Sequence, residues 1–353
     1  MSTAITRTLE GPAAWHGKDL ALSTDWIRPV TPPFVDELDE ALRGLERRRL
    51  RWPDFGPADF PLPTVAGELA AGRRELEHGR GIVLLRGLPV ERYTLDQLRQ
   101  LSWGLGVHRA TPRPQNVSGE LIGEVRDEVR LYGAVRETPG ASSVTRSSRA
   151  RARTSGPLRF HTDRCDVVTL LCVRKARTGG ESKVCSSVAV SNAILARRPD
   201  LHALLCRDYV RNRQGEEAGG ERTTYAMPVF AVRDGHFTSH YSRTFIEAAQ
   251  LLPGVPPLTA AQDEALDLHA RVCEELAITM TFEPGDLQLL NSHVTYHARA
   301  PYEDADGPDR DRLLLRLWLA VPDSRPLPHG FEVLWGDIAA GAPRGGIRIR
   351  QAG

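Results

Sequence analysis

Residues 160–166, FHTDRCD, place a histidine and a carboxylate two positions apart, just before the apolar run VVTLLCV. If this segment is extended, His161 and Asp163 point to the same face of the strand, because side chains alternate with a period of two. A nitrogen and a carboxylate on one face can bind a metal ion. They can equally form a structural hydrogen-bonded pair, so the rest of the chain has to distinguish the two possibilities.

Further along the chain, a second segment supplies more metal-binding residue types. The stretch NSHVTYHAR contains His293 and His297, which share one face if it is extended. Two imidazoles and one carboxylate on one side of a metal form the facial triad of non-heme Fe(II) oxygenases, which leaves coordination positions open for other ligands. Either histidine could complete a site begun by His161 and Asp163, and the residue pattern alone leaves that choice open.

A third segment provides candidate ligands for an anion. In RLLLRLWLA, one strand face has Arg312, Leu314, Arg316 and Trp318, and the other has Leu313, Leu315, Leu317 and Leu319. A buried guanidinium group needs an anionic partner, because an unpaired buried charge is costly. A carboxylate of a ligand would suit such an arginine. For Arg312 the alternative partners are the protein carboxylates Asp286 and Glu303.

Helices and short strands must position these residues. Residues 34–50, FVDELDEALRGLERRRL, have apolar residues at helical spacing, and Thr94 and Thr259 each begin a capping-box pattern with a glutamine three residues later. GIVLLRGLPV predicts a buried strand, and the second half of the chain consists of short apolar runs separated by turn residues. This pattern predicts a mainly β fold with flanking α-helices, such as a jelly roll.

The chain of 353 residues is expected to form a single domain. We expect residues 1–80 to be mostly helical, residues 81–325 to form the strand-rich core and residues 326–353 to be a C-terminal extension. Residues 136–159 show no periodicity and are rich in Ser, Arg, Gly and Pro, which predicts a long loop. Loops of this length often serve as lids.

Composition makes several classes of partner and site unexpected. A net charge of +1 provides no concentrated positive field, so neither nucleic acid nor a membrane is an expected partner. The N-terminus lacks the apolar segment of a secretory signal, which predicts a cytoplasmic protein. Five cysteines without a C-x-x-C pair predict packing roles rather than disulfides or a zinc site. The oligomeric state has no signal in the sequence.

As a set, these motifs resemble those of a known enzyme family. HTD, GGES, PGDLQLLNSHVTYHAR and DRLLLRLWL, with GIVLLRGLPV upstream, resemble the taurine dioxygenase-like (TauD/TfdA) family of Fe(II)- and 2-oxoglutarate-dependent oxygenases over about residues 81–321. Each motif is weak alone, but their order and spacing are specific together. The resemblance implies a double-stranded β-helix, or jelly-roll, fold. It also implies Fe(II) as the metal, with 2-oxoglutarate and O2 as cosubstrates.

The resemblance further implies roles for individual residues. It makes the iron ligands His161, Asp163 and His297, and it leaves His293 as a neighbour of the site. Ser182 and Arg312 would hold the distal carboxylate of 2-oxoglutarate. Arg316 would either strengthen that cosubstrate site or face the substrate. Asp163 is intact, which argues against the halogenase relatives, because those leave the carboxylate position vacant.

Other polar and aromatic side chains are candidates for a substrate pocket. Arg159 lies just before the HTD motif, where relatives often carry an aliphatic residue, so substrate recognition is expected to differ from that of the simple family members. The full set of candidates is Gln115, Asn116, Arg159, Tyr241, Arg243 and Trp318. Positions in surface turns would explain several of them nearly as well.

The resemblance implies an oxygenase that oxidises an unactivated C–H bond of a small molecule and releases succinate and CO2. Its substrate would be an amino acid, a sulfonate or a natural-product intermediate, with hydroxylation as the default outcome and desaturation or ring closure as alternatives. Two other functions stay open: a protein or peptide hydroxylase or demethylase, and a jelly-roll binding module without activity. No basic or aromatic docking stripe stands out, and the complete set of ligand residues argues against the binding module.

Overall fold

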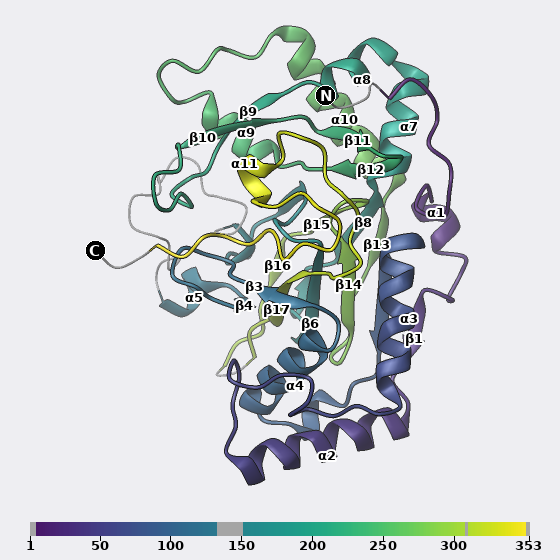
Figure 1. Cartoon of the computed structure of the whole chain (residues 1–353), viewed down its shortest axis with the longest axis vertical. Coiled ribbons are helices and arrows are strands. Elements are labelled where there is room, and N and C mark those ends of the chain that lie inside the picture. Colours follow the sequence, from purple (N-terminus) through teal and green to yellow (C-terminus); the bar gives the residue numbers. More distant parts are fainter. Residues whose placement is uncertain (1–4, 133–150, 308–309, 351–353) are drawn as a thin grey trace.

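The computed structural model describes residues 5–132, 151–307 and 310–350. Two β-sheets form its centre (Figure 1). The larger sheet contains, in spatial order, β1 (Ile27–Pro29), β2 (Ile82–Arg86), β14 (Leu287–Asn291), β6 (Val167–Arg174), β17 (Leu313–Ala320) and β3 (Thr111–Arg113), and β4 (Ile122–Val125) also pairs with β17. The smaller sheet contains β13 (Ile278–Met280), β8 (Ser182–Ser186), β15 (Thr295–Arg299) and β5 (Leu158–His161).

Three short strand pairs lie outside the two main sheets. They are β7 (Thr178–Gly179) with β16 (Tyr302–Glu303), β9 (Tyr209–Asn212) with β10 (Thr224–Met227), and β11 (Phe230–Arg233) with β12 (His236–Ser239). Neighbouring strands are antiparallel throughout these sheets, except that β1 runs parallel to β2. The two antiparallel sheets with helices around them confirm the predicted jelly-roll core.

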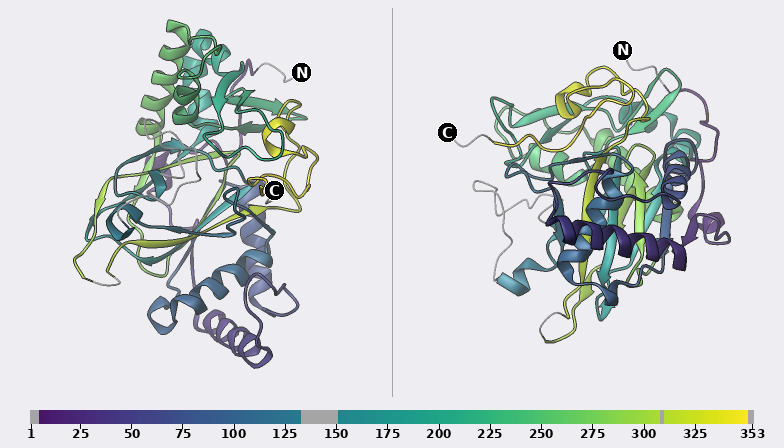
Figure 2. Two further views of the ribbon diagram at one scale, coloured as in Figure 1. Left: turned by 90° about the vertical axis from the view of Figure 1, so that its left-hand side faces the viewer. Right: turned by 60° about the horizontal axis from the view of Figure 1, so that its bottom comes forward.

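Helices cover both ends of this arrangement (Figure 2). They are α1 (Gly17–Leu20), α2 (Pro32–Arg48), α3 (Val65–His78), α4 (Leu95–Val107), α5 (Glu128–Tyr132), α7 (Ser187–Arg197), α8 (Pro199–Leu205), α9 (Arg243–Ala249), α10 (Ala260–Leu276) and α11 (Glu332–Trp335), with a 3-10 turn at Val90–Arg92. The predicted helix at 34–50 is α2, and both predicted capping boxes form, at the start of α4 and of α10.

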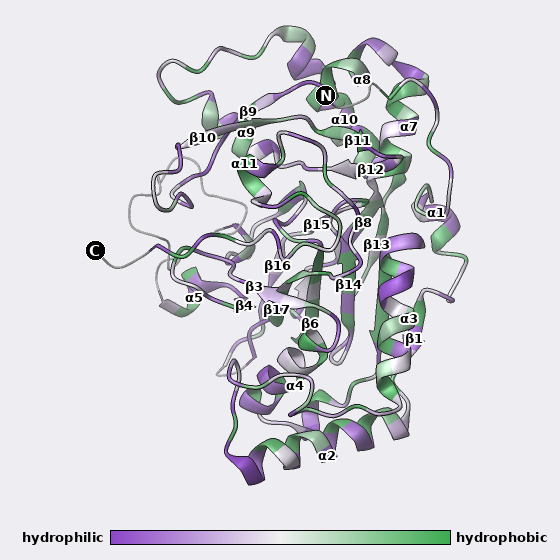
Figure 3. Ribbon diagram, in the orientation of Figure 1, coloured by the Kyte–Doolittle hydropathy of each residue, from purple (hydrophilic) through white to green (hydrophobic). Residues whose placement is uncertain are grey.

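Three hydrophobic clusters hold the layers together. The first joins α2, α3 and α4 to the outer face of the larger sheet, and the second joins α7, α8 and α10 to the smaller sheet. The third lies between the sheets and includes Leu314 and Trp318 from β17. Leu313 and Leu315 of the same strand belong to the first cluster, so β17 alternates between two cores as its sequence predicts. The central strands β6 and β14 are hydrophobic along most of their length (Figure 3).

Three expectations about chain organisation need amendment. Within residues 1–80, β1 joins the larger sheet, so this part adds a strand to the core. Of the predicted loop at 136–159, residues 136–150 lie outside the described residues. Leu158 and Arg159 belong to β5, because Leu158 pairs with Arg299 of β15 and so continues the smaller sheet. The C-terminal residues up to 350 fold back over the core.

All five cysteines are free thiols, and four of them are buried, which confirms their predicted packing role. Among the helices of the described residues, none combines the length and apolar character needed to span a membrane.

Acid should destabilise the fold through His269, whose ring lies 4.0 Å from that of Tyr241 in the second hydrophobic cluster. Burial lowers the pKa of His269 to about 3, whereas an unfolded histidine titrates near 6.5. As the pH falls below about 6.5, the unfolded state takes up a proton that the folded state does not, so stability is lost. Between pH 7.5 and 5.0 this amounts to about 2 kcal/mol of unfolding free energy.

His269→Phe should therefore reduce the difference in unfolding free energy between pH 7.5 and pH 5.0 by about 2 kcal/mol. Urea denaturation of both proteins at each pH measures it. A matched control is His329→Phe, because His329 is exposed, and this variant should keep the wild-type pH dependence. If His269→Phe shows the same pH dependence as the wild type, the assigned cause is wrong.

Candidate metal and cosubstrate site

Strand pairing brings together the three residues that were expected to bind a metal. His161 ends β5 and lies directly opposite His297 of β15, and Asp163 follows two residues after β5. One potential ligand atom from each residue lies within 4.8 Å of the others, and all three residues are buried. The long separation in sequence is thus bridged by a single antiparallel pairing in the smaller sheet.

The distances within this group do not fit a structural hydrogen-bonded pair. Nε2 of His161 lies 3.8 Å from Oδ1 of Asp163, and Nε2 of His297 lies 3.8 Å from Oδ2 of the same carboxylate. Both separations exceed hydrogen-bond length. Oδ2 of Asp163 is buried and accepts no hydrogen bond from any residue described in the structure. Two nitrogens and a carboxylate therefore converge without bonding one another, which is what a shared metal ion would require.

Protonation states in this group also suit a divalent metal. Nδ1 of His161 lies 2.9 Å from the carbonyl oxygen of Arg159, which places the proton on Nδ1 and leaves the lone pair on Nε2. Burial lowers the pKa of His161, and it lowers the pKa of His297 to about 3. Burial alone would raise the pKa of Asp163, but the charge of Arg316 above all outweighs it, so this pKa is lowered. Two neutral imidazoles and a carboxylate result at neutral pH.

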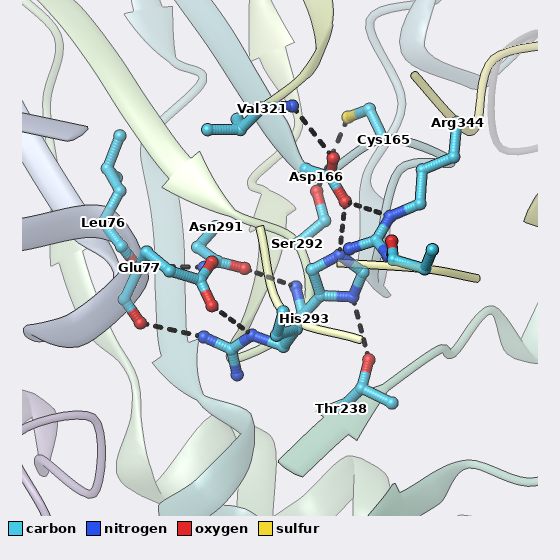
Figure 4. Close-up of polar contacts among 12 residues, drawn as sticks. Leu76, Glu77, Cys165, Asp166, Thr238, Asn291, Ser292, His293, Val321 and Arg344 are labelled. Atoms are coloured by element: carbon cyan, nitrogen blue, oxygen red, sulfur yellow. Dashed lines mark hydrogen bonds and ion pairs between the residues drawn. The ribbon is translucent and has the colours of Figure 1, made fainter. Parts of the chain in front are cut away.

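His293, the alternative ligand, is engaged elsewhere (Figure 4). It lies in a turn before β15, so it does not share the strand face of His297. Its Nε2 lies 2.8 Å from Oδ1 of Asp166, and its Nδ1 lies 2.8 Å from the hydroxyl oxygen of Thr238. With both ring nitrogens occupied by protein atoms, His293 has no lone pair left for the metal group.

The carboxylate of Asp166 also anchors the C-terminal extension (Figure 4). Nε of Arg344 donates to Oδ1 of Asp166 at 2.8 Å, and the backbone N–H of Val321 donates to Oδ2 at 2.9 Å. Arg344 and Asp166 are both fully buried. Since Asp166 follows Asp163 by three residues, this ion pair ties the extension to the segment that carries the metal-binding carboxylate.

Arg344→Met should therefore lower the free energy of unfolding by about 3–5 kcal/mol, because it leaves the buried carboxylate of Asp166 without its cation. Chemical denaturation at pH 7.5 measures the change. The matched control is Arg197→Met, which breaks an exposed pair with Glu275 and should cost at most about 1 kcal/mol. Equal losses in the two variants would contradict a structural role for the Arg344–Asp166 pair.

A cavity of about 440 Å³ adjoins the two histidines. It is lined by His161 and His297, by Ser182 and Arg312, and by apolar side chains that include Leu158, Leu170, Phe282 and Leu314. A cationic group, a hydroxyl and apolar walls beside a metal group match a dicarboxylate with a short hydrocarbon centre. 2-Oxoglutarate has this structure, so the residues present fit the expected cosubstrate.

The charge of Arg312 has no carboxylate partner among the described residues. Asp286 pairs with Arg86 at 2.9 Å and Glu303 pairs with Arg177 at 2.9 Å, so neither protein alternative is used. Nη1 of Arg312 is buried without a hydrogen-bond partner in the described chain. Its guanidinium group is therefore held ready for an anion in the cavity.

The GGES motif provides the close approach that this arrangement needs. Gly180 has a φ of +77°, and a Cβ atom there would lie 3.2 Å from Nε of Arg312. A larger residue would be strained at this backbone angle and would crowd the guanidinium group. The glycine thus lets the chain turn between β7 and β8, where Ser182 begins β8 and reaches the cavity.

Arg316 lines the same cavity as Arg312. Its Nε donates to Oε1 of Gln115 at 2.7 Å, and its Nη1 lies 3.5 Å from Oδ2 of Asp163. Gln115 in turn donates from its Nε2 to the backbone oxygen of Arg316 at 2.8 Å. Gln115, expected in a substrate pocket, is instead a fully buried residue that orients Arg316 beside the carboxylate of Asp163.

A second cavity, of about 490 Å³, also adjoins the metal group. It shares His161 with the first cavity and is lined by Asp163 and by Trp318, which was a predicted pocket residue. None of its other lining residues was predicted from the sequence; they are Thr162, Arg164, Arg213, Glu216, Tyr225, His240, Phe245 and Leu334. Only Thr162 and Arg164 carried a signal, because they flank Asp163 in the HTD motif.

Besides Gln115, four more predicted pocket residues line neither of these two cavities. Asn116 stabilises a turn, where its Oδ1 accepts from the backbone N–H of Ser118 and Glu120. Tyr241 is packed against His269 in the second hydrophobic cluster. Arg159 and Arg243 both form ion pairs with Glu247 at the surface, at 2.7 and 3.0 Å. Asn116, Arg159 and Arg243 thus make local turn or surface contacts, and Tyr241 is part of the core.

Comparison with known proteins gives a consistent result. The model of the family described as "Taurine catabolism dioxygenase TauD, TfdA family" matches residues 45–318. A curated relative, "FR-33289 synthase" of Streptomyces rubellomurinus, is 29% identical and aligns over 97% of this chain and 99% of its own.

Two solved structures have a similar fold. An asparagine oxygenase in complex with Fe(II), 2S,3S-3-hydroxyasparagine and succinate has a TM-score of 0.59 at 19% identity, over 83% of this chain and 93% of its own. The non-heme iron oxygenase OrfP in complex with Fe and alpha-ketoglutaric acid has a TM-score of 0.59 at 15% identity, over the same shares of the two chains. At these identities the likeness concerns the fold.

Proposed function

Because the chain belongs to the TauD/TfdA family of dioxygenases, we propose that His161, Asp163 and His297 are its iron ligands. The convergence of their ligand atoms within 4.8 Å, in a buried group, is the observation that carries this assignment. The free Nε2 of His161 and the Oδ2 of Asp163, which accepts no hydrogen bond from a described residue, support it further. No other cluster of metal-binding side chains was found in the described ranges 5–132, 151–307 and 310–350.

The protein is an Fe(II)- and 2-oxoglutarate-dependent dioxygenase. The bound metal and cosubstrate supply the activation of O2, which couples decarboxylation of 2-oxoglutarate to succinate with oxidation of the substrate. The protein's own residues bind, orient and exclude water. Apolar side chains such as Leu158, Leu170 and Leu314 line the first cavity and keep water away from the site.

We assign Arg312 and Ser182 to the distal carboxylate of 2-oxoglutarate. Arg312 carries an unpaired charge and Ser182 a hydroxyl group, and both line the cavity that adjoins the two histidines. Arg316 acts between the two sites: it strengthens the positive potential of this cavity and holds the carboxylate of Asp163 ionised. Gln115 positions Arg316 through two hydrogen bonds.

The proposed substrate is a small molecule that enters the second cavity, where Asp163 and Trp318 form part of the wall. An amino acid or a natural-product intermediate is consistent with the asparagine oxygenase and the synthase to which the chain is similar. Hydroxylation of an unactivated C–H bond is the proposed outcome. The buried side chains of Asp163 and Arg164 in the wall of this cavity suit contact with a small polar ligand.

We also propose that the chain works as one oxygenase domain in the cytoplasm. The first hydrophobic cluster supports the single domain, because it runs from α2 in the N-terminal part to β17 near the C-terminus. The C-terminal extension supports it as well, through the buried pair between Arg344 and Asp166.

Anaerobic absorption spectroscopy tests the proposed function. Addition of Fe(II) and then 2-oxoglutarate to the metal-free protein should produce a visible charge-transfer band of the chelated cosubstrate, and addition of O2 should then yield succinate. A folded protein without the band would contradict the assignment. Candidate substrates can be screened by the shift that they cause in the band and by the substrate-dependent increase in succinate.

A further inference from the structure

Two arginines that line the second cavity are buried in its wall. Arg164 directly follows Asp163, and Arg213 directly follows β9. Arg164 is 8% exposed and Arg213 is 4% exposed. Both line the cavity of about 490 Å³ that also contacts His161 and Asp163. The two guanidinium groups therefore lie in the compartment next to the proposed metal ligands.

Neither arginine is paired with a carboxylate of the described chain. The side chain of Arg164 makes no hydrogen bond or ion pair with any residue that the structure describes, and its Nε is buried. Arg213 is held in place by backbone carbonyl groups: its Nε donates to Arg222 at 3.0 Å and its Nη2 donates to Val333 at 2.7 Å. Its Nη1 is buried without a partner among the same residues. Carbonyl groups orient this guanidinium but do not neutralise it.

The charges of the two arginines add in the cavity. Guanidinium groups stay protonated in proteins, and both arginines line the same cavity. The wall of this cavity also has two carboxylates, Asp163 and Glu216, and Asp163 is the proposed metal ligand. Glu216 therefore balances at most one of the two arginine charges, which leaves an excess of positive charge.

Aromatic contacts do not remove this charge. The guanidinium carbon of Arg213 lies 4.9 Å from the ring centre of Tyr225, which also lines the cavity. Such a contact stabilises a cation and fixes its position, but it leaves the N–H groups available for an anion. Buried cations without a counter-ion are costly to maintain, which indicates that a ligand supplies the missing negative charge.

We propose that Arg164 and Arg213 form the site for an oxyanionic group of the substrate, namely a carboxylate, a sulfonate or a phosphonate. The proposal rests on the proposed function and specifies its substrate class. Two planar guanidinium groups can each donate paired N–H groups to the oxygens of such an anion. Arg316 does not serve this site, because it lines the cosubstrate cavity and is bound to Gln115.

Anion binding here would also determine which bond is oxidised. Because Arg164 follows Asp163 directly, the anion would be fixed within one residue of a proposed metal ligand. The rest of the substrate would then extend along the cavity past Trp318 and His161. Binding energy from the charged end holds the reacting carbon in place, which is how enzymes use contacts remote from the reacting bond.

Calorimetric titration of the anaerobic Fe(II)- and 2-oxoglutarate-loaded enzyme tests the proposal. The probes are butyrate, propanesulfonate and propylphosphonate, which share a propyl chain and differ in the oxyanion, with neutral 1-butanol as the uncharged comparison. At least one anion should bind, and the alcohol should not. The anion that binds most tightly identifies the oxyanion class of the substrate. Binding of none of them, or equal binding of the alcohol, would overturn the proposal.

Two variants locate the binding. Arg164→Met should weaken binding of the strongest probe roughly 10- to 100-fold, as expected for the loss of charge-assisted hydrogen bonds. Arg213→Gln should weaken it comparably and provides a second test. The matched control is Arg197→Met on α7, whose guanidinium pairs with Glu275 at the surface. It should bind the probe as the wild type does, and unchanged affinity in Arg164→Met would overturn the assignment.

Thermal unfolding separates a binding role from a structural one. Without probe, Arg164→Met should unfold at the same temperature as the wild type or higher, because it removes a buried charge that repels Arg213. A fall of several degrees would indicate that Arg164 is structural. The Fe(II)–2-oxoglutarate absorption band should persist in this variant. Absence of the band in the wild type would instead contradict the proposed function. The same anions titrated into the metal-free protein would then still test the arginine site by itself.

Discussion

Replacing Asp163 by alanine should abolish iron binding and reduce substrate-dependent succinate formation to background. The carboxylate is the only proposed ligand with negative charge, and both of its oxygens face the histidine nitrogens at 3.8 Å. Without it, two neutral imidazoles would have to bind a divalent cation beside the positive charge of Arg316, which lies 3.5 Å from Oδ2 in the wild type. Metal analysis of the desalted protein and the anaerobic absorption band measure the loss.

The control for this variant is His293→Gln. His293 is as deeply buried as the proposed ligands and lies near them in sequence, but its ring nitrogens contact Asp166 and Thr238. This variant should keep stoichiometric iron and the absorption band, although it is expected to lose stability. Circular dichroism establishes that each variant is folded. Iron retained by Asp163→Ala, or lost only by the folded His293→Gln variant, would require a different ligand set.

Replacing Arg312 by methionine should raise the KM for 2-oxoglutarate by roughly 10- to 150-fold, as expected for the loss of hydrogen bonds to a charged group. The KM for the substrate should change little, because Arg312 lines the first cavity and not the second. The buried and unpartnered Nη1 of Arg312 is the basis for this expectation. Initial rates measured with each compound varied in turn separate the two constants.

Arg316→Met provides the matched comparison, because Arg316 lies on the same strand face and lines the same cavity. It should raise the KM for 2-oxoglutarate less than Arg312→Met does, because the guanidinium group of Arg316 already contacts Gln115 and Asp163. Arg312→Lys should bind 2-oxoglutarate more tightly than Arg312→Met does, because lysine keeps the positive charge. It should bind less tightly than the wild type, because lysine lacks the paired N–H donors of arginine. If Arg316→Met raises the KM for 2-oxoglutarate more than Arg312→Met does, the roles of the two arginines are reversed.

Local sequence patterns were sufficient for the parts of the site that depend on strand alternation. The alternation along β17 and the residue before it places Arg312 and Arg316 opposite Leu313 and Leu315, and the structure has this arrangement. The capping boxes at Thr94 and Thr259 also form as expected. Such features depend on residues within a few positions of one another, so the sequence contains the information directly.

The choice of His297 over His293 needed more than the alternation of side chains. Both histidines share one face only if the whole segment is extended, and the turn at residues 292–294 breaks that condition. In the structure, His297 pairs with His161, while His293 contacts Asp166 and Thr238. The family resemblance led to the same residue by matching motif positions. Strand alternation by itself could not distinguish His297 from His293.

The sequence by itself determined the jelly-roll class, the enzyme family and the three residues that we propose as metal ligands, because each depends on short motifs and on their order. Only the tertiary structure decided what surrounds that group. Arg213, Tyr225 and Leu334 reach the second cavity from the end of β9, from β10 and from α11, whereas Arg159 and Tyr241 lie outside it. Cavity walls arise from contacts between segments far apart in the chain, and no local pattern records which distant side chains will meet.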